Sequence, residues 1–507
     1  MTERAAARLG LAVVSTVIAL ASAEAATRWL GGFGFRARLH IEQTSEQISP
    51  SPSQKLLGRN DAMEHASRLP VASGVDRQWY AVDPPLAGRE VDPMLKRRYR
   101  EQDEGFELPS EYEWNRQYVM NAVCESRPRL PVFSHVDDLY LFDPVDGSTR
   151  PPFRFLRNIR YPSGLRTNSF GWRGADVSLN KPARTIRIAF VGASTTIDPH
   201  GDAFSYPEYV GRWLNEWSLA RGYGVRFESI NAGREGVDST SIAAIVATEL
   251  VPVRPDLVVY YEGSNQFWPA DYISDELPPR PRQVAKPIPP IERYSALALR
   301  AHSAWNAWRE GYEPPKPAIR VNWPATLDEH DPPLSDPRLP VQLPVILRDL
   351  EAISAAVSSY GGTLVPSSFV WLVHRGLVLD RRRDAGLYSY LNESYWPFSY
   401  AHMRRLIDFQ NRVFRKYAVS SRLLPFNDVA SVYPRDPRLF LDAIHMTPAG
   451  IKLKAWLVFQ QLVPHLAARI ADGRLPLRDE GGRTVHPAFT TGGPSLTRLD
   501  DVRRLCS

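Results

Sequence analysis

Four short segments of the sequence carry the side chains that acyl-transfer chemistry needs. They are 192–195 (GAST), 231–236 (NAGREG), 262–266 (EGSNQ) and 442–445 (DAIH). In chain order they supply a serine, two glycine turns, an asparagine, and an aspartate three residues before a histidine. Each of these residue types has a defined task when an acyl group is transferred through a serine ester.

The serine, histidine and aspartate form a candidate catalytic triad. A serine hydroxyl becomes a useful nucleophile only when a neighbouring base removes its proton. His445 can be that base, and Asp442 can orient the imidazole and stabilise the imidazolium that forms. Because only three residues separate Asp442 from His445, both can lie on one loop. We therefore predict that Ser194, Asp442 and His445 are the catalytic residues.

The glycine and asparagine segments supply candidate oxyanion donors. The tetrahedral intermediate of acyl transfer carries a negatively charged oxygen, which hydrogen-bond donors stabilise. The backbone N–H groups of Ser194 and Gly236 and the side-chain amide of Asn265 can donate to it. The sequence lacks a phosphate-binding GxxxxGK motif, and no metal-ligand cluster is visible in it. The predicted chemistry needs no cofactor and no metal.

The elements around these segments predict an α/β fold. Apolar runs predict strands at 186–191, 225–231, 256–263, 363–373 and 423–429. Helical spacing predicts helices at 207–222, 241–250, 343–362, 400–418 and from Thr447-Pro448 onward. This alternation indicates a flavodoxin-like, doubly wound parallel sheet with helices on both faces. Sites in such sheets form at the carboxyl ends of the strands, where the four segments fall.

In this order, the four segments resemble the blocks of the SGNH (GDSL-like) hydrolase family, over about residues 160–470. The resemblance assigns the nucleophile to Ser194, the oxyanion donors to Gly236 and Asn265, and the base with its aspartate to His445 and Asp442. Gly233 is a second possible register for the glycine block.

Two positions differ from the family pattern, because Ala193 and Gln266 stand where aspartate is usual. The segment 166–174 (RTNSFGWRG) is similar to the lead-in of exported, membrane-anchored members.

The amino terminus indicates export. Arg4 and Arg8 precede an uncharged apolar run, 9–23, which ends in the small-x-small pattern of residues 21–23 (ASA). This is the pattern of a secretory signal, and the run extends far enough to serve instead as an uncleaved anchor. We expect an extracytoplasmic protein, periplasmic or secreted, with residues 1–30 as signal peptide or inner-membrane anchor.

The remaining chain divides by composition. We expect an irregular region at 31–182, a hydrolase domain at 183–470 with a proline-rich insertion at 269–340, and a tail at 471–507. The insertion leaves the sheet four residues after Asn265, so we expect it to wall the cleft and limit substrate size. Whether Cys124 and Cys506 pair is left open.

Charge excludes one class of partner. The net charge of +6 is spread thinly over 507 residues, whereas nucleic-acid binders concentrate basic residues on one face. The sequence predicts an exported serine esterase that hydrolyses an O-acyl ester of a small molecule, a cell-envelope glycan or a lipid. An O-acyltransferase with the same triad, or a non-catalytic envelope protein on this scaffold, fits the same residues.

Overall fold

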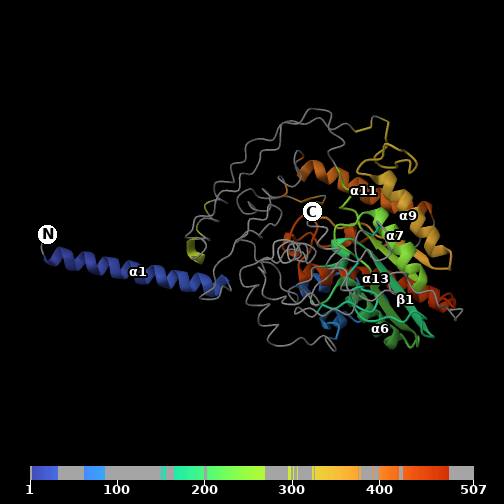
Figure 1. Cartoon of the computed structure of the whole chain (residues 1–507), viewed down its shortest axis with the longest axis horizontal. Coiled ribbons are helices and arrows are strands. Elements are labelled where there is room, and N and C mark those ends of the chain that lie inside the picture. Colours follow the sequence, from blue (N-terminus) through green and yellow to red (C-terminus); the bar gives the residue numbers. More distant parts are fainter. Residues whose placement is uncertain are drawn as a thin grey trace, which may run out of the picture.

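The computed structural model describes residues 3–31, 62–85, 150–151, 154–155, 165–198, 203–268, 295–298, 301, 305, 323–324, 326–374, 376–377, 391, 398, 400–421 and 426–478. A long helix at the amino terminus projects from a body in which helices surround a sheet (Figure 1). The tail predicted at 471–507 lies outside the described residues from 479 onward, as do Cys124 and Cys506.

Within the described residues, the sheet has four parallel strands in the order β2-β1-β3-β4. The strands are β1 (Thr185–Gly192), β2 (Arg226–Asn231), β3 (Leu257–Tyr261) and β4 (Thr363–Pro366). Every residue of β1 and β3 is buried, which is the mark of strands covered on both faces. The sequence prediction of a doubly wound parallel sheet is confirmed.

Two pairs of helices cover this sheet. One pair is α6 (Tyr206–Arg221) with α13 (Pro448–Ala471), and the other is α7 (Ser239–Ile245) with α9 (Leu343–Ser358). Helix α11 (Tyr400–Ser420) packs against β4 and α9 (Figure 1). The further described elements are α1 (Glu3–Gly31), α2 (Met63–Arg68), η1 (Arg77–Ala81), α5 (Ser194–Ile197), η4 (Val246–Leu250), η5 (Val251–Val253), α12 (Val429–Val432) and η8 (Pro437–Leu439).

Local sequence signals fix the ends of the two helices nearest the site. Ser205 and Glu208 form a capping box at the start of α6, and Gly222 ends it in the left-handed conformation. Thr447 caps α13 by accepting a hydrogen bond from the backbone N–H of Gly450, with Pro448 at the first helical position. The predicted start of the last helix is confirmed.

Part of the amino-terminal region is built into the main body. Tyr80 in η1 packs against Trp213 of α6 and Trp456 of α13, with ring centroids 6.0 and 5.6 Å away. The indole N–H of Trp213 donates to the carbonyl of Trp79 at 2.7 Å. Residues 62–85 therefore complete the aromatic core on this side of the sheet.

Two predicted strands differ from the structure. The strand expected at 363–373 ends at Pro366, because from there the backbone pairs with Asn427 and no longer with β3. The strand expected at 423–429 is described only from 426 onward, where Asn427 forms a parallel bridge with Ser367 and α12 begins at Val429.

Most of the insertion expected at 269–340 lies outside the described residues. Of its tryptophans, Trp323 packs against Phe409 of α11 and beneath the guanidinium of Arg405. The lid role of the insertion stays a prediction.

Candidate active site

The predicted nucleophile lies at the carboxyl end of the central strand. Strand β1 ends at Gly192, and α5 begins two residues later at Ser194. A Cβ atom at Gly192 would collide with the Tyr261 carbonyl oxygen and the Thr196 side chain. Glycine is therefore required where the chain leaves the sheet, and Ser194 follows directly, half-buried at the sheet edge.

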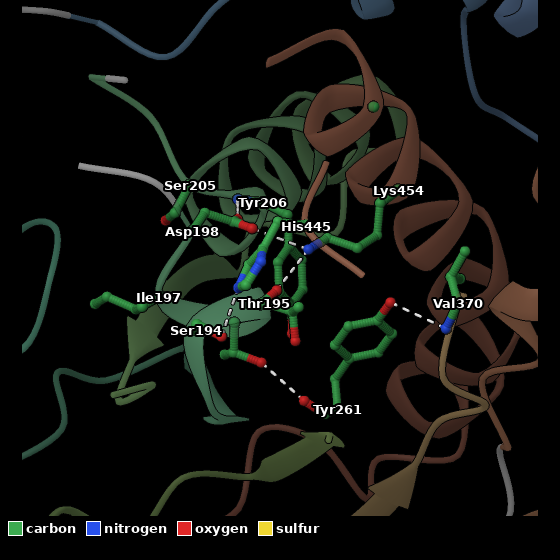
Figure 2. A network of polar contacts seen from close by, with 12 residues as sticks. Ser194, Thr195, Ile197, Asp198, Ser205, Tyr206, Tyr261, Val370, His445 and Lys454 are labelled. Carbon is green, nitrogen blue, oxygen red and sulfur yellow. Dashed lines mark hydrogen bonds and ion pairs between the residues drawn. The ribbon is translucent and has the colours of Figure 1, made fainter. Parts of the chain in front are cut away.

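The three predicted triad residues meet at this edge, although 251 positions separate Ser194 from His445. His445 Nε2 lies 2.8 Å from Ser194 Oγ (Figure 2), and His445 Nδ1 lies 2.5 Å from Asp442 Oδ2. The geometry is that of a serine whose hydroxyl donates to an imidazole, with the other ring nitrogen donating to a carboxylate.

Hydrogen bonds within the loop that carries Asp442 and His445 hold its conformation. Asp442 Oδ1 accepts hydrogen bonds from the N–H groups of Ile444 and His445, at 2.8 and 2.6 Å. The backbone N–H of Leu441 donates to the carbonyl of His445 at 2.8 Å. One carboxylate oxygen of Asp442 therefore shapes the loop, while the other faces the imidazole.

The electrostatics of the pair suit a general base. Burial by itself raises the pKa of Asp442, but the charge and hydrogen bonds of His445 outweigh it and hold that pKa below its ordinary value. Burial by itself lowers the pKa of His445, but the charge and hydrogen bond of Asp442 outweigh it and raise that pKa. Asp442 thus stays ionised and favours the imidazolium that proton transfer would create.

The two predicted oxyanion segments are joined to each other. The Asn265 side-chain amide donates to the carbonyl of Val237, the residue after Gly236, at 2.8 Å. Gly236 is exposed and has a positive φ of 66°, a conformation that favours glycine. The contact orients the Asn265 amide and ties the third segment to the second.

A buried carboxylate that the sequence prediction missed organises the asparagine turn. Glu262 Oε1 accepts from the backbone N–H groups of Ser264 and Asn265, at 2.6 and 2.9 Å. Burial raises the pKa of Glu262, and these hydrogen bonds oppose the rise. Its position directly before GSN, at the end of an apolar strand, was the available sequence signal.

A second missed group lies beneath the nucleophile. Lys454 of α13 reaches the carbonyl of Thr195 and the carboxylate of Asp198, and the backbone N–H of Tyr206 donates to the same carboxylate (Figure 2). The signal available in the sequence was a pair of lysines, at 452 and 454, in the otherwise apolar run IKLKAWLVF. Helical spacing alone does not say what such lysines face.

Among the residues that the structure describes, no group of three or more histidine, cysteine, aspartate or glutamate side chains is arranged to hold a metal ion.

Comparisons with known proteins identify similar folds. No family model and no curated protein matches the sequence. Among solved structures, the chain is similar to the acetylxylan esterase Axe2 from Geobacillus stearothermophilus, with 14% identity over 55% of this chain and 94% of that one, at a TM-score of 0.31. It is similar to a GDSL-like lipase from Parabacteroides merdae, with 12% identity over 54% and 94%, at a TM-score of 0.30. The third is LAE5, an alpha/beta hydrolase from the metagenome of Lake Arreo, with 15% identity over 54% and 94%, at 0.29.

At these identities and TM-scores, neither activity nor substrate is transferred from those proteins to this chain.

Proposed function

We propose that this chain is an exported serine esterase of the SGNH type that cleaves an O-acyl ester. The observation that carries the proposal is the continuous chain of hydrogen-bond contacts from Ser194 through His445 to Asp442 at the carboxyl edge of the sheet. A serine, a base and an orienting carboxylate in this order are the requirement for nucleophilic acyl transfer.

The acylation step follows from this geometry. Ser194 Oγ attacks the ester carbonyl carbon while His445 Nε2 takes the hydroxyl proton. The electrons of the carbonyl π bond move to the carbonyl oxygen, which becomes the negatively charged oxygen of a tetrahedral intermediate. When that intermediate collapses, the bond to the leaving oxygen breaks and His445 returns the proton to it. The products are a free alcohol and an acyl ester on Ser194.

Deacylation repeats the steps with water. His445 takes a proton from a water molecule while the water oxygen attacks the acyl carbon. A second tetrahedral intermediate forms. Collapse breaks the bond to Ser194 Oγ, which recovers its proton from His445, and a carboxylic acid leaves. The negative oxygen of both intermediates is assigned to the N–H groups of Ser194, Gly236 and the Asn265 amide, which are proposed as oxyanion donors.

The first test is covalent labelling. A fluorophosphonate probe should label the wild-type chain at Ser194, and Ser194→Ala should abolish both labelling and hydrolysis of 4-nitrophenyl acetate. The matched control is Thr240→Ala, a hydroxyl residue near the start of α7 whose described contacts are with Asp349 and Arg348. Labelling that persists in Ser194→Ala would remove Ser194 as the nucleophile. A wild type that neither labels nor hydrolyses esters would refute the esterase proposal in favour of a non-catalytic scaffold.

Hydrolysis and acyl transfer share the acyl-enzyme, so the acceptor must be measured. We expect the acyl group to leave as free carboxylic acid when a sugar alcohol is added as a competing acceptor. Transfer of most of the acyl group to the added hydroxyl, measured by mass spectrometry, would identify an O-acyltransferase with the same catalytic residues.

The proposed substrate is an ester on a cell-envelope glycan or a lipid, and this rests on compartment. Helix α1 contains a span, Gly10–Arg28, long and apolar enough to cross a membrane, although a signal sequence has the same properties. Its apolar side chains are exposed, with Leu11 at 69% and Val17 at 60%. We propose that this helix directs export and anchors the catalytic domain in the inner membrane.

A further inference from the structure

Lys454 is a buried cation that the proposed mechanism does not use. It lies on α13 with 1% of its surface exposed, and polar groups and aromatic rings, among them that of Tyr261 at 5.1 Å, surround its ammonium. It donates to the carbonyl of Thr195 at 2.6 Å and to Asp198 Oδ1 at 2.9 Å. It also lies 4.3 Å from the centre of the Tyr206 ring, which favours a cation.

The carbonyl groups next to Lys454 belong to the turn that carries the nucleophile. The last carbonyls of any helix lack partners within it, and α5 is only four residues long. Side chains from distant segments supply those partners at 2.6 to 2.9 Å: Lys454 to the carbonyl of Thr195, Asn231 to that of Thr196, and Arg173 to those of Ile197 and Asp198. The turn behind Ser194 is therefore fixed from outside.

We propose that Lys454 is a positioning residue for Ser194, which it serves by holding the carbonyl end of α5 together with its counter-ion Asp198. The inference rests on the esterase function proposed above. Of these donors, Lys454 holds the carbonyl nearest in sequence to the nucleophile, because its acceptor Thr195 directly follows Ser194. Loss of this contact leaves the buried carbonyl of Thr195 without this donor and the buried Asp198 carboxylate without its lysine counter-ion, which favours a shift of the turn.

The charge of Lys454 also acts on the base. Three charged groups from separate segments act on the His445 imidazole: Asp442 on the same loop, Glu262 after β3, and Lys454 on α13. Of these, Asp442 and Glu262 raise the pKa of His445, whereas Lys454 lowers it. A positive charge here favours the neutral imidazole, which is the form that accepts the proton of Ser194.

The same helix provides a matched control. Lys452, two residues earlier, is also fully buried, and its ammonium donates to Asp83 at 2.6 Å and lies 5.3 Å from the Tyr80 ring. It differs from Lys454 in facing the amino-terminal segment and not the nucleophile turn. Lys452→Met therefore removes a buried lysine and leaves a carboxylate without this partner, without touching α5.

The experiment compares Lys454→Met, Lys454→Arg, the double variant Lys454→Met/Asp198→Asn, and Lys452→Met, each as the full chain in detergent. The readouts are kcat and KM for 4-nitrophenyl acetate, the acidic limb of the pH profile of kcat/KM, and the His445 titration followed by NMR. The NMR signal is assigned by its loss in His445→Gln. The double variant leaves no unpaired buried carboxylate, so it serves if Lys454→Met does not fold.

In Lys454→Met and in the double variant we expect kcat to fall about tenfold to a hundredfold with KM within about twofold, because the nucleophile is displaced. In Lys454→Met we expect the acidic limb to move to higher pH by about half a unit to one unit, because a positive charge near His445 is lost. The double variant also loses the negative charge of Asp198, so its limb should move in the same direction by less, because Lys454 and not Asp198 is among the charges that act on His445. Lys454→Arg should leave the acidic limb of the pH profile unchanged. Lys452→Met should leave both kcat and the acidic limb unchanged.

An unmoved limb in Lys454→Met and in the double variant would overturn the proposal, and so would an equal loss of kcat in Lys452→Met. Failure of the esterase proposal can be distinguished from failure of the Lys454 proposal. In that case the wild type neither hydrolyses esters nor labels at Ser194, while the NMR titration of His445 still reports whether removal of Lys454 raises its pKa.

Discussion

At the scale of single residues, the protonation state of His445 is the property on which the proposed chemistry depends. The base must be neutral to accept the proton of Ser194, yet it must hold that proton in the intermediate. Asp442 favours the charged imidazole, and Lys454 favours the neutral one. Burial also lowers the pKa of His445, but the charge and hydrogen bond of Asp442 outweigh burial and Lys454, so the net direction is upward.

The first residue-scale prediction concerns pH. Because the pKa of His445 is raised, neutral His445 becomes abundant only above the ordinary imidazole value of about 6.5. We expect kcat/KM to rise with pH through a midpoint above that value. Asp442→Asn removes the raising influence, so the midpoint should move to lower pH, and kcat should fall by about 10⁴ because the ring loses its orienting partner. A pH profile with the same midpoint in both chains would contradict the assigned roles.

The second residue-scale prediction concerns Asn265. Its amide donates one hydrogen bond to Val237, and its second amide hydrogen is the proposed oxyanion donor. Asn265→Ala should lower kcat by about two to three orders of magnitude with the thermal unfolding midpoint little changed. Ser264→Ala is the control, since this hydroxyl contacts Glu262. Full activity in Asn265→Ala would remove the residue from the site.

At the scale of elements, the site depends on the close approach of β1, α5 and β3. The hydroxyl of Thr196 in α5 donates to the carbonyl of Tyr261, the last residue of β3, at 3.0 Å. Gly192 lies between the two and has no room for a side chain. The sheet edge and the nucleophile turn are therefore one packed unit, and a single methyl group inserted there forces them apart.

This packing gives an element-scale prediction. Gly192→Ala should destabilise the domain by about 3 kcal/mol or more, because the new Cβ meets backbone that cannot move aside. The thermal unfolding midpoint should fall by on the order of 10 °C. Gly222→Ala is the control: it ends α6 at a φ of 66° with nothing near the added atom, so only backbone strain of about 1–2 kcal/mol is expected. Equal thermal unfolding midpoints in the two variants would show that the neighbours of Gly192 move aside for the added Cβ atom.

At the scale of the whole molecule, the amino-terminal helix is the part that we propose relates the site to a membrane. Helix α1 continues without a break through the small-x-small pattern at 21–23 to Gly31. Beyond that pattern, the Glu24 carboxylate accepts hydrogen bonds from the Ser295 hydroxyl and from the N–H groups of Ala296 and Leu297, at 2.8 to 2.9 Å. Two segments distant in sequence thus meet at the point where a signal peptidase would cut.

We therefore expect the helix to be retained. The chain should sediment with membranes, resist extraction at alkaline pH, and keep its amino-terminal peptide in mass spectrometry. A phosphatase reporter fused after residue 40 should be active, because the segment that follows the helix is expected outside the cytoplasm. A mature soluble chain that begins at Glu24 would establish a cleaved signal peptide instead, and an inactive but well-expressed reporter would contradict export.

The sequence by itself determined the order and type of the central elements and the candidate chemistry. Apolar runs, Gly192 and the Thr447-Pro448 start signal act over a few residues, so their meaning survives without knowledge of the fold. The serine, asparagine, aspartate and histidine were visible for the same reason: each follows a strand or precedes a helix that local pattern predicts.

Only the tertiary structure decided what surrounds those residues. Whether Lys454 faces solvent, core or the nucleophile turn depends on how α13 packs against the sheet, and no local pattern encodes that packing. The end of β4 at Pro366 likewise depends on a distant segment, because the backbone pairs with Asn427 from that point. Lys454 and Asp198 lie 256 positions apart and meet because helix packing and strand register bring them together, and those are properties of the assembled chain.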